Sequence, residues 1–178
     1  MDRVFREHMS ELYWLAFLLT GDRERSVRAF TGALQGDTQP PAFEKFMLSW
    51  ARKLVIVSAL GTIRRELRES ASQNRPAAGA ELAGLGRLAP VDRAALSKRE
   101  LEEALLAMDI FPRCAVILTV LEGLPVKEAA GLLGVDQNTV KAAQARGVSE
   151  MTWRMADVIG PLSRRPFNFD QPALAACG

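Results

Sequence analysis

Residues 121–151 read LEGLPVKEAAGLLGVDQNTVKAAQARGVSEM. A pattern typical of a short helix runs over 126–133 and meets Gly134, and a second helical pattern begins after Asp136, a residue type that favours the N-cap position. Gly134 can adopt the positive φ that a sharp turn requires, and the adjacent alanines of the first helix let two helices approach closely. The stretch therefore predicts a helix-turn-helix.

In a helix-turn-helix, the second helix lies in the major groove of DNA and its outer face contacts the bases and phosphates. The candidate DNA-binding residues on this helix are Gln137, Asn138, Thr139, Lys141, Gln144, Ala145 and Arg146. Two short helices joined by glycine also occur as a simple packing motif. The preceding LEGLP at 121–125 predicts a helix end and a turn, and this order favours a three-helix DNA-binding unit.

The composition fits a globular helical protein of one domain or two small ones, with 178 residues of which 48% are hydrophobic. The net charge of +2 is weak evidence for nucleic-acid binding, so local basic patches must supply it. The longest apolar run near the start, 12–20, is too short to span a bilayer, and no signal-peptide pattern precedes it. We expect a cytoplasmic protein without membrane insertion.

Metal or catalytic chemistry has little support in the sequence. The chain has two cysteines, Cys114 and Cys177, and a single histidine, His8, without metal-ligand spacing. No paired carboxylates, phosphate-binding glycine loop or nucleophile-base set is recognisable. We expect no metal, no cofactor and no enzymatic activity, and we interpret Cys114 as a small buried hydrophobic residue.

Apolar residues at helical spacing predict three helices in the N-terminal part, over 2–19, 23–34 and 42–69, with a bend near Gly61 in the third. Their predicted buried residues are Phe5, Met9, Leu12, Ala16, Leu19, Val27, Phe30, Leu34, Phe43, Met47, Trp50, Leu54, Val57 and Leu67. The third helix also carries basic residues that could form a cationic surface, Arg52, Lys53, Arg64, Arg65 and Arg68, of which the first four are candidate DNA-binding residues. A solvated helix face explains such a charge run equally well.

Helical periodicity is lost in SASQNRPAAGAELAGLGRLAP at 70–90, which predicts a flexible linker, and it returns with a capping box that begins at Ser97. The fold predicted is all-α, with two small helical domains joined by this linker and a helix-turn-helix in the second. The boundaries are 1–70 for the first domain, 71–96 for the linker, 97–158 for the second domain and 159–178 for a C-terminal tail.

Several segments resemble the extracytoplasmic-function sigma factors, which are small bacterial transcription initiation factors. In the C-terminal half these are LEEAL at 101–105, LEGL at 121–124, EAA at 128–130, LLGV at 132–135 and TVK at 139–141. In the N-terminal half, LYWLAFLLTGD at 12–22 is similar to the family's LY.LA..LTGD, and FEKFMLSWARKL at 43–54 resembles its F..WL...AR.L helix. The resemblance implies promoter DNA and core RNA polymerase as partners, an anti-sigma factor as a further partner, and transcription initiation as the function.

The chain also departs from the family pattern. The acidic AEDLVQE.F of the family's second helix is replaced by SVRAFTGAL at 26–34, where Arg28 has the wrong sign for a basic partner. In the third helix, Val57 stands where the family has a polar residue. In the second helix of the helix-turn-helix, the recognition helix, only Lys141 and Arg146 remain of the family's basic residues. These departures keep an alternative open: a sigma-like interaction module that has lost polymerase or promoter contacts and binds an anti-sigma protein.

Overall fold

The computed structural model describes residues 2–35, 41, 46–73 and 98–159. The described part is all-α, as predicted, and contains no strand. Residues 74–96 of the predicted linker, 160–178 of the predicted tail and Ser97 of the capping box lie outside the described residues, whereas 71–73 and 159 are described and are helical. No described helix is long and apolar enough to cross a membrane.

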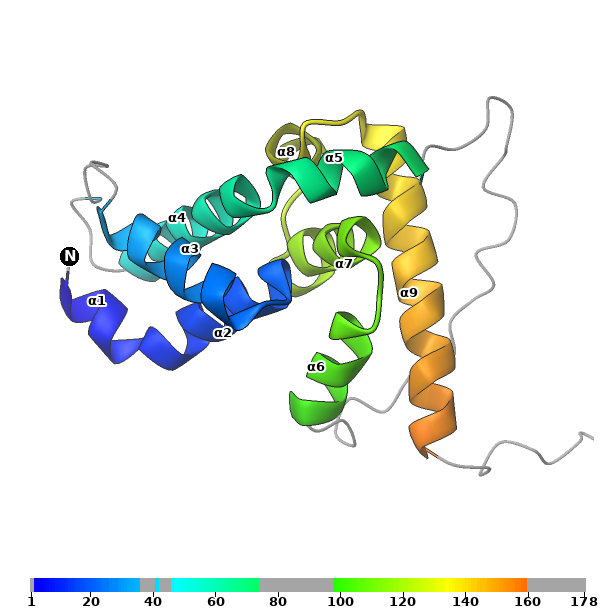
Figure 1. The fold of residues 1–178 in the computed structure, drawn as a ribbon, viewed down its shortest axis with the longest axis horizontal. Coiled ribbons are helices and arrows are strands. Elements are labelled where there is room, and N and C mark those ends of the chain that lie inside the picture. The colour runs from blue at the N-terminus through cyan, green and yellow to red at the C-terminus, as the bar shows by residue number, and fades with distance from the viewer. Residues whose placement is uncertain (1, 36–40, 42–45, 74–97, 160–178) are drawn as a thin grey trace, which may run out of the picture.

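The N-terminal half is a group of packed helices, with α2, α3 and α4 in mutual contact (Figure 1). Its elements are α1 (Asp2–Glu7), α2 (Met9–Thr20), α3 (Arg23–Gln35), α4 (Met47–Thr62) and α5 (Arg64–Gln73). At the α2–α3 turn, Gly21 has a φ of 69° and its N–H donates to the Phe17 carbonyl at 2.8 Å. The Asp22 carboxylate then accepts the backbone N–H of Arg25 at 2.8 Å, which caps the start of α3.

The C-terminal half is built around α7, which packs along the long helix α9 (Figure 1). Its elements are α6 (Lys98–Leu106), α7 (Ile110–Val116), the π turn η2 (Ile117–Leu121), α8 (Val126–Leu133) and α9 (Gln137–Ile159). Gly147 of α9 lies so close to α7 that a Cβ there would be 2.6 Å from Cγ2 of Val116 and 3.1 Å from the Pro112 carbonyl oxygen. The missing side chain therefore lets the two helices pack tightly.

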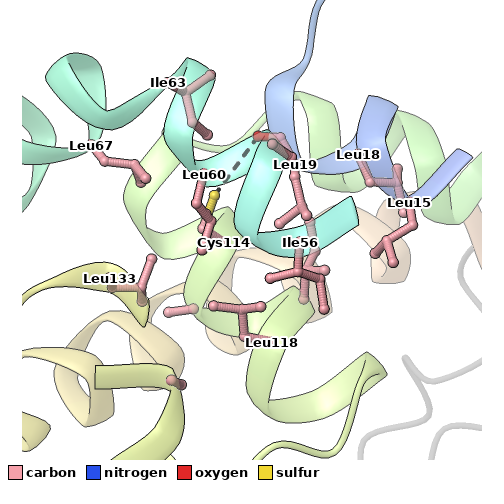
Figure 2. Close-up of a cluster of buried hydrophobic side chains, with 14 of the residues drawn as sticks. Leu15, Leu18, Leu19, Ile56, Leu60, Ile63, Leu67, Cys114, Leu118 and Leu133 are labelled. Carbon is pink, nitrogen blue, oxygen red and sulfur yellow. Dashed lines mark hydrogen bonds between the residues drawn. The ribbon is translucent and has the colours of Figure 1, made fainter. Parts of the chain in front are cut away.

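The two halves share one hydrophobic core. Figure 2 shows leucine and isoleucine side chains of α2, α4 and α5 gathered with Cys114 of α7 and with residues of η2 and α8. The residues of the N-terminal half labelled there are Leu15, Leu18, Leu19, Ile56, Leu60, Ile63 and Leu67, and those of the C-terminal half are Cys114, Leu118 and Leu133. Cys114 is fully buried, as predicted. The described parts of the two halves therefore lie in direct contact, and the proposed domain boundaries stay a prediction.

Two predicted helices are broken in the structure. The helix expected over 2–19 is interrupted at His8, and the helix expected over 42–69 is divided at Ile63 rather than at Gly61. Ile63 itself is buried, so the break turns α5 onto the C-terminal half while keeping an apolar side chain in the core. The periodicity predicted the apolar faces but did not reveal the break at His8, because the stripe continues across it, whereas the bend expected near Gly61 occurs at Ile63.

Some residues assigned to the core are exposed. Val27 and Val57 are each 50% exposed and Met9 is 54% exposed, so their predicted burial is wrong. Each lies at helical spacing from buried neighbours but at the edge of the apolar stripe, where solvent reaches it. The residues of the same stripes that are buried are Phe5, Leu12, Ala16, Leu19 and Leu67.

Candidate nucleic-acid interface

The turn between α8 and α9 has the geometry that the glycine predicted. Gly134 adopts a left-handed conformation with φ of 70°, and its N–H and that of Val135 both donate to the Ala130 carbonyl, at 2.9 and 3.1 Å. A glycine in the left-handed region, followed by N–H groups that donate back to a carbonyl in the last turn of the helix, forms a helix C-cap. The chain therefore leaves α8 sharply and enters α9 within three residues.

Asp136 caps the start of α9. Its carboxylate accepts the backbone N–H groups of Asn138 and Thr139, each at 2.9 Å, and the Thr139 hydroxyl at 2.6 Å. The hydroxyl and N–H of Thr139 hold the pKa of the Asp136 carboxyl below its ordinary value. The cap fixes the direction in which the first turn of α9 presents its side chains.

The inner face of α9 packs against the rest of the C-terminal half. Val140 and Ala143 are buried, and so are Ala129 and Ala130 of α8. Small and β-branched side chains on this face bring the two helices together, as the sequence predicted. The opposite side of the first turn is left open to solvent.

Three of the predicted DNA-binding residues are exposed on that open side: Gln137, Asn138 and Lys141. They line a shallow hollow together with Lys127 of α8. Two amide side chains and two ammonium groups thus lie at the junction of the two helices. Amides can bond to base edges, and lysines can bind phosphates without sequence preference.

The other predicted residues of α9 are placed differently. Thr139 is 3% exposed and its hydroxyl is bound to Asp136, so its side chain supports the helix start. Gln144 is partly buried. Arg146 is exposed, and its Nη2 lies 3.4 Å from the Asp109 carboxylate at the start of α7. Their predicted DNA contacts stay predictions.

Helix α5 lies beside the helix-turn-helix (Figure 1). Arg64 and Arg68 line a groove with Gly131 of α8 and Gly134 of the turn that follows, and Arg68 also lines a neighbouring hollow with Asp136. Within the described part of the chain, no carboxylate bonds to Arg64 or Arg68. The structure thus brings part of the predicted cationic surface of the N-terminal half next to the turn of the helix-turn-helix.

Arg65, also predicted to bind DNA, pairs with Glu69 within α5 at 3.0 Å. Two further basic residues belong to this surface: Arg68, which the sequence placed in the basic run of the third helix, and Lys127, which sequence reasoning missed. Arg68 belongs to the same basic run as Arg64, so its spacing carried a signal. Lys127 carried none, because only the fold places the start of α8 beside Lys141.

Arg52 and Lys53, the remaining predicted DNA-binding residues, form ion pairs with the C-terminal half. Nε and Nη2 of Arg52 donate to the two carboxylate oxygens of Glu122 at 2.8 and 2.5 Å, and Nζ of Lys53 lies 2.6 Å from the Glu128 carboxylate. The hydrogen bonds that Arg52 donates to the Glu122 carboxylate raise the pKa of Arg52. Both cations are therefore engaged by carboxylates in this arrangement.

Across the described residues, no group of three or more His, Cys, Asp or Glu side chains is placed to hold a metal ion. The Cys114 thiol is fully buried, and burial raises its pKa to about 12. A thiol in this state is neutral at physiological pH and is a poor nucleophile. The chemistry of the surface is that of amides, ammonium groups and guanidinium groups.

Comparison with known proteins agrees with this geometry. Residues 98–151 match the family model described as Sigma-70, region 4. The chain is 26% identical over 167 residues, which is 91% of this chain and 78% of the relative, to the protein named ECF RNA polymerase sigma factor SigM in two strains of Mycobacterium tuberculosis. No solved structure matches the chain.

The segment that matches the region 4 model runs from the start of α6 into α9 and contains the helix-turn-helix. The similarity to SigM extends through the N-terminal half as well. The chain is therefore similar to a sigma region 4 model in its C-terminal half and to an extracytoplasmic-function sigma factor along most of its length.

Proposed function

We propose that this protein initiates transcription by binding promoter DNA through the exposed start of α9 while it is bound to core RNA polymerase. The observation that carries the proposal is the helix-turn-helix, in which Asp136 caps a second helix that displays Gln137, Asn138 and Lys141 to solvent. The match to sigma region 4 over the same residues supports it. The role requires no catalytic chemistry from the chain, and it places the protein in the bacterial cytoplasm with the polymerase.

Each group has a distinct proposed task. Gln137 and Asn138 read base edges in the major groove, because amides present a donor and an acceptor side by side. Lys141, Arg146, Lys127 and the arginines of α5 bind phosphates, which supplies affinity but little sequence information. Thr139 acts through the cap, and the partly buried Gln144 remains a candidate DNA contact further along α9.

The domain assignment belongs to the same proposal. Residues 1–70 form the unit that holds polymerase and opens the upstream promoter element, and residues 97–158 form the unit that reads the distal element. Residues 71–96 join them, with 159–178 following as a tail. The packing of α2, α3 and α4 as one group and of α7 and α9 as another supports two units.

Charge reversal at Lys141 tests the recognition surface. Bound duplexes are first selected from a mixed-sequence library with core polymerase and this chain, and binding of the selected duplex is then measured over a range of salt concentrations. We expect Lys141→Glu to weaken binding and to reduce the slope of log affinity against log salt by about one, since one phosphate contact is lost. Arg99→Glu is the matched control, because Arg99 is exposed on α6, which lies far from the start of α9 in Figure 1. Equal affinities and slopes for the two variants would refute the placement of the recognition surface.

A second candidate function rests on α3. Val27 and Arg28 lie exposed on this helix, where the family has an acidic docking pattern, and Arg28 pairs only with Glu24 one turn earlier among the described residues. A surface without the acids fits a protein that binds an anti-sigma factor and no longer binds polymerase. Pull-down of core polymerase by the purified chain distinguishes the two candidates, because the second predicts no polymerase in the bound fraction.

A further inference from the structure

Two ion pairs cross between the described halves with charged side chains on both sides. Arg52 binds Glu122 through two parallel N–H donors, a geometry that is stronger and more specific than a single contact. Lys53, the next residue, binds Glu128. Adjacent cations of α4 are thus held by two carboxylates of the C-terminal half.

Local backbone structure places Glu122 for this contact. The π turn over Ile117–Leu121 ends with the Glu122 N–H donating to the Ile117 carbonyl at 2.9 Å, and Gly123 follows with φ of 65°. π turns are rare and recur at functional positions. The Glu122 side chain is only 8% exposed, so Arg52 is its means of avoiding an unpaired buried charge.

A second polar contact closes the opposite side of the interface. The indole N–H of Trp14 donates to the Glu102 carboxylate of α6 at 2.8 Å, and the Lys98 ammonium lies 4.7 Å from the centre of the same ring. These contacts join α2 to α6, whereas the Arg52 and Lys53 pairs join α4 to η2 and α8. The closed arrangement is therefore held at separated points.

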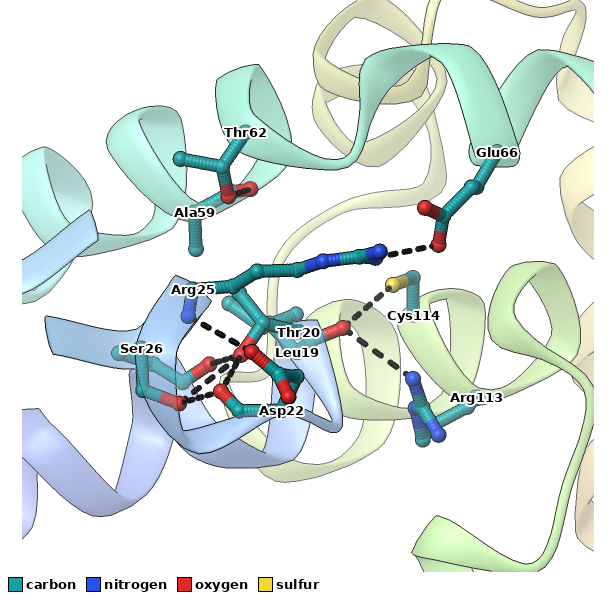
Figure 3. A network of polar contacts seen from close by, with 11 residues as sticks. Leu19, Thr20, Asp22, Arg25, Ser26, Ala59, Thr62, Glu66, Arg113 and Cys114 are labelled. Carbon is teal, nitrogen blue, oxygen red and sulfur yellow. Dashed lines mark hydrogen bonds and ion pairs between the residues drawn. The ribbon is translucent and has the colours of Figure 1, made fainter. Parts of the chain in front are cut away.

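The same interface buries a guanidinium group, that of Arg113, at a cost in free energy. Arg113 of α7 is 6% exposed and reaches the C-terminal end of α2, where Nη2 lies 3.5 Å from the Leu19 carbonyl (Figure 3). Its Nε has no hydrogen-bond partner, and no carboxylate within the described part pairs with it. Burial lowers the pKa of this guanidinium. Separation of the halves would hydrate Arg113, so the closed arrangement is easier to open than its apolar core alone suggests.

We propose that Glu122 and Glu128 form an intramolecular latch that holds the two halves closed by binding Arg52 and Lys53, and that DNA competes with the latch for these two cations. This inference rests on the proposed function, which assigns the protein to DNA. In the closed form, the carboxylates occupy the positions that phosphates would take on Arg52 and Lys53. DNA binding by this part of α4 therefore requires the halves to separate.

The latch lowers apparent DNA affinity by the fraction of molecules that are open. Neutralising both carboxylates removes the pairs between the halves and raises that fraction, while Arg52 keeps the Glu11 carboxylate of its own half at 3.9 Å. A neutral variant also loses negative charge, which favours DNA binding without any latch. A control must therefore remove equal charge from the same half without touching the interface.

The test compares Glu122→Gln/Glu128→Gln with Glu103→Gln/Glu150→Gln in the full chain. Glu103 and Glu150 pair with Arg99 and Arg154 within their own helices, so their loss leaves the interface intact. Anisotropy of a short fluorescein-labelled mixed-sequence duplex gives DNA affinity, and small-angle X-ray scattering gives the radius of gyration. Circular dichroism verifies folding, and the single Glu128→Gln variant, at a more exposed position, covers the case in which the double variant does not fold.

We expect the latch variant to bind the duplex about tenfold more tightly than the control variant and to have a larger radius of gyration. Equal affinities and equal radii for the two variants, with measurable binding, would overturn the latch and leave the proposed function standing. A larger radius without tighter binding would also overturn it, because DNA would not compete for Arg52 and Lys53. Absence of binding by every variant, the unmodified protein included, would refute the proposed function and the latch with it.

Discussion

Replacement of Gly147 by alanine tests the packing of the recognition helix against α7. A Cβ at this position would lie 2.6 Å from Cγ2 of Val116, closer than real Cβ contacts occur, and 3.1 Å from the Pro112 carbonyl oxygen. Val116 is fully buried and the Pro112 oxygen belongs to the backbone, so neither neighbour can move aside freely. The methyl group must instead push α9 away from α7.

The magnitude follows from two opposing effects. Overpacking of a tight core contact costs about 2–3 kcal/mol, whereas alanine gains about 1 kcal/mol over glycine within a helix. We therefore expect Gly147→Ala to lower the free energy of unfolding by about 1–2 kcal/mol. Gly131 of α8 is the matched control, because a Cβ there meets nothing within 4 Å. Gly131→Ala should raise the free energy of unfolding by about 0.5–1 kcal/mol.

Urea unfolding followed by far-ultraviolet circular dichroism measures both changes on the same scale. The two alanine variants should differ by about 2 kcal/mol, although the substitution is chemically identical. A Gly147→Ala protein as stable as the Gly131→Ala protein would refute the close approach of α9 and α7. It would also remove the basis for the direction in which α9 presents Lys141.

Three further predictions concern single side chains. In a Cys177→Ser background, the native protein should not react with a thiol reagent at neutral pH, whereas the unfolded protein should, because Cys114 is buried and burial raises its pKa to about 12. Because this pKa lies above the ordinary value of 9.0, the contribution of the neutral Cys114 thiol to the free energy of unfolding is complete below pH 9.0 and is lost as the pH rises toward about 12. Urea unfolding at alkaline pH should show this loss in the protein with Cys114 but not in the Cys114→Ala variant. Asp136→Ala should lower the urea midpoint of unfolding at neutral pH. The stabilisation that comes from the lowered Asp136 pKa is present above the ordinary value of 3.8 and disappears as the pH falls through the native pKa. The urea midpoints of the variant and of the unmodified protein should therefore converge in acid. Trp153→Phe should remove most of the iodide-quenchable fluorescence, because Trp153 is 75% exposed while Trp14 and Trp50 are partly buried; unchanged quenching would contradict this placement.

The helix-turn-helix could be predicted from the sequence because its signals are local. Gly134 and Asp136 act on the residues beside them, through a positive φ and through N–H groups two and three residues further on. Such signals do not depend on the rest of the fold. The range of α3 and the extent of α9 followed in the same way from periodicity and caps.

The break at His8 and the position of the break at Ile63 could not be predicted, because no proline or positive-φ residue marks either residue. They arise where α2 and α5 turn onto the shared core, which is a property of the tertiary packing. The pairing of Arg52 with Glu122 was hidden for a similar reason, since 70 residues separate them. A basic run in a sequence gives no sign of which carboxylates the fold brings to it.

The most direct test of the account is gel filtration of the purified protein with core RNA polymerase from its own organism, at low and at moderate salt. The account predicts that the protein elutes with the polymerase at both salt concentrations, which would show that contacts other than the family's acidic pattern hold the complex. Elution of the protein in its own free position at both concentrations would contradict the assignment of a working initiation factor.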